Sequence, residues 1–279
     1  MSSSEGYILN AVQTPGPLLP VYRSISNGSE TKSHIESDTQ IDSGLDEILN
    51  GLRLLRMVGK EEEAYYAREH EWDVGDERWN FRLTALHNLA QECQPTDWGK
   101  QAAVLLNYKF LLDKDIQHFE NNEEPIYSDI DKWYTDINYR PQSQQGLIVH
   151  NDPKFANWTR LVHFLGLVHK VSGREHTVYP DPTLIRHSLE LAAEDRAIDI
   201  DGTPGISIEQ YLRWLREKLL YIETTSDGAI PEGIARVLFE LVLDDDIRIV
   251  EYGDAGTVTL GGIPPYDGID SEANAIKLI

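Results

Sequence analysis

Cysteine is almost lacking from this chain of 279 residues, because Cys93 is its single copy. One cysteine excludes an intramolecular disulfide and a cysteine-based zinc cluster, and it is typical of proteins from a reducing cytoplasm. No apolar run approaches the roughly 18 residues of a membrane helix, and Met1–Asn10 lacks the basic region and apolar run of a secretory signal. We therefore expect a cytoplasmic protein without membrane association.

The sequence also lacks the common motifs of catalytic and nucleotide-binding sites. It contains no G-x-x-x-x-G-K-[ST], no G-x-G-x-x-G and no G-x-S-x-G, so phosphate-loop, dinucleotide and α/β-hydrolase sites have no motif support. Asp199-Ile200-Asp201-Gly202 resembles half of a calcium loop, but Ala197 and Ile208 occupy positions where acids are required. The spacing of the histidines does not match a metal-binding pair on one helix face. We expect no catalytic residue, cofactor or metal.

Basic residues are few relative to acidic ones. The chain has 47 acidic and 25 basic residues, which give a formal charge of −22 at pH 7. Only 10 of the basic residues are lysines. Such a surface repels DNA phosphates over most of its area. We interpret the lysine-poor, acidic composition as that of a halophilic protein from a salt-rich cytoplasm, and an acidic protein adapter that never touches DNA is the alternative.

The chain does contain a pattern of an amphipathic helix followed by a two-stranded ribbon, most clearly over 230–262. Pro231 stands where a first-turn proline belongs, apolar residues follow at helical spacing, and Asp244-Asp245-Asp246 ends the helix. A strand over 247–252, a turn over 253–256 and a strand over 257–260 are then predicted. A helix that runs into such a ribbon is typical of the end of a winged helix.

Related patterns occupy Gly6–His70 and Asp152–Pro182. We predict a mostly α protein with small β wings, of α+β class, in which tandem winged-helix domains are joined by a helical hairpin. Residues 71–125 read as wholly helical, 126–147 as an ordered connection, Gly202–Gly205 as a loop, and the tail Gly261–Ile279 as turn-rich and mobile at its end. The predicted domains are winged-helix-like segments over 1–70, 148–200 and 201–279 and a helical linker over 71–147.

The best local group of basic and aromatic residues falls on the predicted recognition helix and wing of the 152–182 pattern. Such donors are what contacts to phosphates and base edges need. The same group would equally suit a domain contact. Weaker basic groups are Arg53, Arg56 and Lys60 in the first pattern and Arg236 and Arg248 in the last. The predicted DNA-binding residues are Trp158, Arg160, His163, Lys170, Arg174 and His176.

Short motifs in the C-terminal half carry a family resemblance. They are the spellings Phe155-Ala156-Asn157-Trp158-Thr159-Arg160, Phe164-Leu165-Gly166-Leu167 and Pro180-Asp181-Pro182-Thr183, together with the 230–260 unit. These resemble the DpdG accessory proteins of prokaryotic DNA-modification and restriction clusters that install 7-deazapurine bases in DNA. The resemblance implies a non-catalytic component that works beside helicases and nucleases, and it supplies no catalytic residues.

These observations predict a non-catalytic, winged-helix subunit of a prokaryotic DNA-modification and restriction defence system. It would bind double-stranded DNA or assemble with other subunits such as a helicase or nuclease. The alternatives are an acidic adapter between proteins and a winged-helix transcription regulator without catalytic activity.

The halophilic interpretation makes a prediction about stability. Raising KCl shortens the Debye length from about 8 Å at 0.15 M to about 3 Å at 1 M, which relieves repulsion among the acids. We expect the melting temperature, followed by circular dichroism, to rise over this range. An ordered fold at low salt with no gain at high salt would contradict the interpretation.

Overall fold

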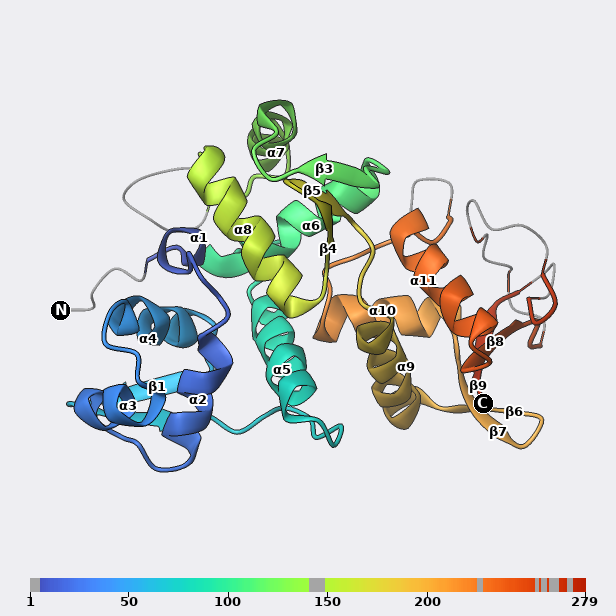
Figure 1. Ribbon diagram of the computed structural model, residues 1–279. Coiled ribbons are helices and arrows are strands. Elements are labelled where there is room, and N and C mark those ends of the chain that lie inside the picture. Colours follow the sequence, from blue (N-terminus) through green and yellow to red (C-terminus); the bar gives the residue numbers. More distant parts are fainter. Residues whose placement is uncertain are drawn as a thin grey trace. The chain divides into compact units, whose positions relative to one another are not determined.

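Helices dominate the protein, and its strands form small sheets. A computed structural model describes residues 6–140, 149–224, 228–253, 256, 260, 266–269 and 273–279. In these ranges the strands make one two-stranded, one three-stranded and one four-stranded sheet (Figure 1). This confirms the expected α+β class. None of the helices in the described ranges combines the length and apolar character needed to cross a bilayer.

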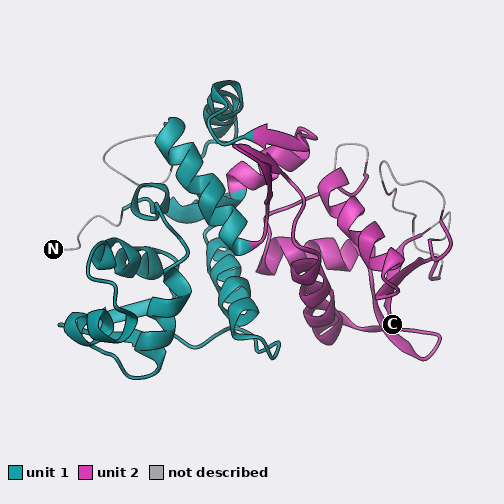
Figure 2. Cartoon of the chain, in the orientation of Figure 1, with its two compact units in different colours: residues 1–105, 120–165 teal, residues 106–119, 166–279 magenta. Residues whose placement is uncertain are grey.

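The chain divides into two compact units (Figure 2). Unit 1 comprises residues 1–105 and 120–165, and unit 2 comprises residues 106–119 and 166–279. One helix continues through the boundary at 105, and another ends at the boundary at 165. The division into four domains that the sequence predicts stays a prediction.

Unit 1 is almost entirely helical, with a single hairpin. Its elements are α1 (Ile8–Ala11), α2 (Leu18–Ser26), α3 (Lys32–Thr39), α4 (Leu45–Leu54), β1 (Val58–Glu61), β2 (Ala64–Ala67), α5 (Glu77–Gln91), the 3-10 helix η1 (Lys100–Ala102), α7 (Glu124–Asp136) and α8 (Asp152–Leu165).

Unit 2 carries the larger sheets and three helices packed against them. Helix α6 (Ala103–Asp113) enters it from unit 1. The elements that follow are β3 (His118–Glu120), β4 (His169–Ser172), β5 (Glu175–Thr177), α9 (Pro182–Arg196), β6 (Ile198–Ile200), β7 (Thr203–Ser207), α10 (Ile208–Lys218), α11 (Glu232–Leu243), β8 (Ile247–Val250) and β9 (Ala275–Leu278).

Helix α4 shows how the N-terminal core forms. Leu45, Leu49 and Leu52 recur at helical spacing and are at most 2% exposed. The helix starts after its N-cap Gly44, whose φ of 80° belongs to the left-handed region that favours glycine. Gly51 allows a close approach, because a methyl group there would lie 2.7 Å from Val12 Cγ2.

The hairpin β1–β2 is tied to the helices by its second strand. Tyr65 N–H donates to the carbonyl of Glu30, in the segment between α2 and α3, at 2.7 Å. Across the hairpin Gly59 pairs with Tyr66, and the Tyr66 ring lies so close over Gly59 that a methyl group there would clash at 2.1 Å. The glycine and the aromatic ring therefore define this register.

In unit 2, α9 packs against α10, α11 and strand β7. Two polar contacts join α9 to α10: the buried pair Ser188 Oγ and Tyr211 Oη lies 2.6 Å apart, and Trp214 Nε1 donates to Asp195 Oδ2 at 2.7 Å. The sheet beside them has the order β6-β7-β9-β8, and every neighbouring pair is antiparallel.

One order of elements occurs three times along the chain: a helix, an extended segment, two helices and a hairpin or strand pair. We call these the first, second and third helix–hairpin sets. The first is α2, Glu30, α3, α4, β1 and β2. The second is α6, β3, α7, α8, β4 and β5, which the boundary divides between the units. The third is α9, the strands β6–β7, α10, α11, β8 and β9.

Several sequence-based expectations between 71 and 147 were wrong. The region 71–125 is not wholly helical, because β3 lies within it and joins a sheet through β5. Part of the expected connection over 126–147 is helix α7, whose buried face consists of Ile126, Tyr127, Ile130 and Tyr134. These four residues recur at helical spacing although two of them are tyrosines. Pro125 lies in the first turn, where proline is compatible with a helix.

The C-terminal end also differs from expectation. Gly202–Gly205 was predicted to be a loop, but Thr203–Ser207 is strand β7. The expected mobile tail contains β9, which lies between β7 and β8, with Ala275 and Ile276 fully buried. Of the strand predicted over 257–260, residues 257–259 lie outside the described residues, and Leu260 forms a parallel bridge with Ile230. Strand β9 has only four residues and is distant in the sequence from its partner strands, so the alternation of its side chains is too short to predict a strand.

The central position of β9 predicts that its apolar side chains stabilise unit 2. Ile276→Asp removes about 1.5–3 kcal/mol of apolar burial and adds the cost of an unpaired buried charge. We expect a clearly lower urea midpoint in fluorescence-detected unfolding. Ile279→Asp is the matched control, because Ile279 is 66% exposed. Equal midpoints for the two variants would contradict the position of β9.

Candidate partner and nucleic-acid surfaces

The six predicted DNA-binding residues come from two neighbouring elements. Trp158, Arg160 and His163 lie on α8 in unit 1, and Lys170, Arg174 and His176 belong to the β4–β5 hairpin in unit 2. Four of the six side chains are exposed and two are buried.

Trp158 belongs to the core of unit 1. The residue is 0% exposed, its ring stacks on Phe155 with centroids 5.1 Å apart, and its Nε1 donates to the carbonyl of Val104 at 3.0 Å. A tryptophan that is fully buried and hydrogen-bonded cannot reach a DNA groove. The assignment of Trp158 as a DNA contact is therefore corrected to a packing role.

His176 is also internal. It is 5% exposed, and its ring stacks on Phe119 with centroids 5.6 Å apart and planes 27° apart. Its Nδ1 donates to the carbonyl of Arg174 at 2.8 Å. This buried ring packs the hairpin against β3, so the assignment of His176 as a DNA contact is corrected as well.

Arg160 and His163 lie on the exposed face of α8. The Arg160 guanidinium is already engaged, because Nη1 donates to Asn157 Oδ1 at 2.7 Å and to the carbonyl of Gln13 at 3.3 Å. These bonds hold the guanidinium along the protein surface. Both residues remain accessible, but the arginine is partly satisfied within unit 1.

The β4–β5 hairpin carries two exposed cations near its turn. Lys170 and Arg174 are exposed, and neither forms an ion pair within the described residues. Between them lies Val171, which is 55% exposed and is not one of the six residues predicted from the sequence. The neighbouring acid is Glu175, whose Oε1 lies 3.8 Å from His118 Nδ1. The hairpin therefore presents two cations around an apolar residue.

The third helix and hairpin of the first set carry mainly acids. The exposed positions of α4 include Asp46, Glu47, Asn50 and Arg53, and the hairpin turn carries Glu61, Glu62 and Glu63. The two other basic residues named from the sequence are paired: Arg56 with Glu92, and Lys60 with Glu63 at 3.5 Å. The net charge of this surface is negative.

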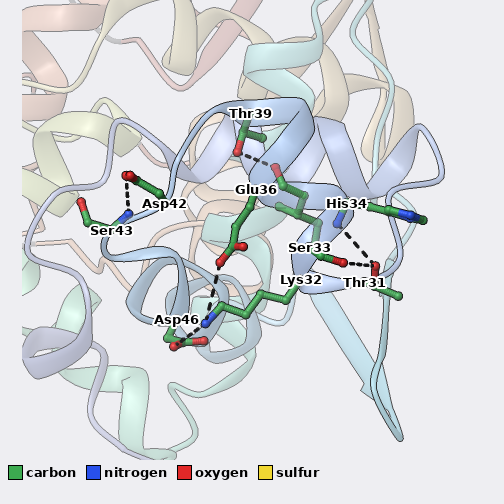
Figure 3. A network of polar contacts seen from close by, with 10 residues as sticks. Thr31, Lys32, Ser33, His34, Glu36, Thr39, Asp42, Ser43 and Asp46 are labelled. Carbon is green, nitrogen blue, oxygen red and sulfur yellow. Dashed lines mark hydrogen bonds and ion pairs between the residues drawn. The ribbon is translucent and has the colours of Figure 1, made fainter.

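Polar contacts join α3 to the start of α4 (Figure 3). Lys32 Nζ lies 2.8 Å from Asp46 Oδ2 and 3.9 Å from Glu36 Oε1, and the hydrogen bond to Asp46 raises the pKa of Lys32. Thr31 caps α3 by accepting from His34 N–H at 3.4 Å. Lys32 is therefore paired with two acids, Glu36 and Asp46, and adds little positive potential to this surface.

The corresponding surface of the third set is also acidic. Arg236 Nε donates to Glu232 Oε1 at 2.6 Å, and this hydrogen bond raises the pKa of Arg236. Glu240, Asp244 and Asp245 are exposed near the end of α11. Arg248 is exposed on β8, where it pairs with Lys277 of β9. Exposed cations therefore occur in every set, and those of the second set are Arg160 on α8 in unit 1 and Lys170 and Arg174 on the β4–β5 hairpin in unit 2.

The buried position of Trp158 makes a prediction that separates packing from binding. Trp158→Ala is expected to lower the stability of unit 1 by about 3–5 kcal/mol because it leaves a cavity. Arg174→Ala is expected to change stability by no more than about 0.5 kcal/mol, as exposed substitutions do. Chemical unfolding of both variants would measure this. Wild-type stability for Trp158→Ala would contradict the packing role.

Neither metal binding nor known relatives add to this picture. In the described ranges no three or more His, Cys, Asp or Glu side chains are grouped so that they could hold a metal ion. No protein-family model, curated protein or solved structure matches the chain.

Proposed function

We propose that this chain is a tandem winged-helix protein and works as a non-catalytic assembly subunit, binding other proteins through acidic surfaces. The winged-helix part is supported by the order of elements, which recurs in the three helix–hairpin sets. In a winged helix the strand between the first two helices pairs with the second strand of the wing. The sheet orders β3-β5-β4 and β7-β9-β8 have this pairing, and Tyr65 N–H makes the equivalent bond to Glu30.

The observation that carries the assembly role is the charge of the first set. Proteins with this architecture read DNA with the N-terminal residues of a helix inserted in the major groove. Here the first turn of α4 carries Asp46 and Glu47, and the wing carries Glu61, Glu62 and Glu63. Phosphates would be repelled from both elements. A basic protein surface is the complementary ligand, and such complementarity accelerates association and selects partners.

The mechanism proposed is presentation on a rigid scaffold. Apolar side chains such as Trp158 on α8 and Ile276 on β9 are buried in the cores of the units, whereas acids such as Asp46 and Glu47 are exposed. The resemblance to the DpdG proteins would place the partners among the helicases and nucleases of a defence cluster. Neighbouring genes that encode such enzymes would support this context.

Contact with double-stranded DNA is a second candidate, and it is favoured by the exposed Lys170 and Arg174 of the β4–β5 hairpin. The salt dependence of DNA affinity has a slope of about −0.9 per neutralised phosphate, so two cations give a slope of only about −2. Binding by this hairpin would therefore be weak and largely independent of sequence. Such DNA binding would occur in addition to the proposed binding of partner proteins.

The proposed function predicts different effects for two charge reversals. Asp46→Lys with Glu47→Lys should release a protein partner that co-purifies with the wild-type chain from its own cells after nuclease treatment. Lys170→Glu with Arg174→Glu should retain that partner and lose residual duplex binding, followed by fluorescence anisotropy across a KCl series.

The converse result would contradict the assembly role. It consists of tight duplex binding with a slope of about −6 or steeper, as many phosphate contacts give, and no stoichiometric protein partner. Retention of the partner by the Asp46→Lys, Glu47→Lys variant would remove α4 from the partner surface.

A further inference from the structure

Unit 1 contains a cavity of about 230 Å³ beside the start of α4. It is enclosed by the segment after α1, the start of α2 and the residues that lead into α4. Val12 and Leu18 are buried at its floor, at 3% and 0% exposure. Its half-buried apolar wall residues are Ala11, Pro17, Ile41 and Ile48.

The floor of this cavity is held in place by close packing. Because Gly51 has no side chain, α4 approaches Val12 closely, and a methyl group at Gly51 would also lie 3.3 Å from Leu18 Cδ2. Val12 and Leu18 are thereby fixed against α4. The cavity lies between the segment before the first set and helices α2 and α4 of that set.

The charge at the rim is negative. Glu47 lines the cavity, as do Ser43 and Gly44. Asp42 and Asp46 lie close to these residues in the sequence. Asp46 is paired with Lys32, whereas Asp42 and Glu47 form no ion pair within the described part of the chain. On the opposite side Arg160 donates to the carbonyl of the lining residue Gln13, and its second bond goes to Asn157.

We propose that this cavity receives one apolar side chain from a basic segment of a partner protein. Pockets for drug-sized ligands have volumes of roughly 300–1,000 Å³, so a cavity of about 230 Å³ suits a single leucine, isoleucine or methionine side chain. Lysine or arginine residues beside that side chain complement Asp42 and Glu47. The inference rests on the proposed assembly function and names the chemistry of the partner.

The test uses the full chain with labelled isoleucine, leucine and valine methyl groups and a synthetic peptide with one leucine between lysines. We expect the methyl signals of Val12, Leu18, Ile41 and Ile48 to shift and saturate in NMR titrations. Peptides with serine in place of leucine, or with glutamates in place of lysines, should bind at least about tenfold more weakly. Equal binding of all three peptides, or no shift at millimolar peptide, would overturn the proposal.

Variants connect this test to the partner. Ile48→Trp should fill the cavity and abolish the shifts, while Asn50→Trp, on the exposed face of the same helix, should leave them unchanged. Circular dichroism establishes that each variant is folded, and Ala11→Trp replaces Ile48→Trp if the latter is not. If Ile48→Trp still binds the natural partner, the cavity proposal fails and the assembly function stands. If no protein partner exists, the assembly function fails, and the peptide titration still decides whether the cavity binds.

Discussion

The structure depends on strand pairing between segments far apart in the sequence. In each helix–hairpin set, an extended segment that precedes two helices pairs with the last strand of the set. In the first set this is the bond from Tyr65 to Glu30, and in the third it is the antiparallel pairing of β7 with β9. Such a pairing closes a loop that contains two helices, so in the first and third sets, each within one unit, it constrains where the last strands lie relative to the helices of the set. The exposed faces described above follow from that constraint.

Charge is the second constraint, and it separates the sets from one another. The formal charge of the chain is −22, so little of its surface has a positive potential. Cations that are not paired with neighbouring acids contribute most to that potential. Arg56, Lys60 and Arg236 are each bonded to a glutamate, whereas Lys170 and Arg174 are not within the described residues. Three sets with one order of elements can therefore present different surfaces, and only their side chains distinguish a partner surface from a nucleic-acid surface.

The sequence predicted the elements with strong periodicity and gave less warning of the others. The amphipathic helix expected after Pro231 is α11, and the strand expected over 247–252 contains β8, because each carries its signal within its own residues. Strands β3, β7 and β9 were missed. Each is short, and each is a strand because of a partner elsewhere in the chain and not because of its own pattern. For the candidate site, residue type could not tell that Trp158 and His176 are buried whereas Arg160, Lys170 and Arg174 are exposed.

The sequence by itself determined the mixed α+β class, the positions of the long amphipathic helices and the acidic balance of the surface. These properties are local or additive, so composition and helical spacing suffice to establish them. Only the tertiary structure decided which aromatic and basic residues are exposed, where the C-terminal strand pairs and that a cavity lies beside α4. Those outcomes depend on contacts between residues distant in the chain, such as Trp158 with Val104 and Ile276 with Ile206, and no local pattern encodes such a contact.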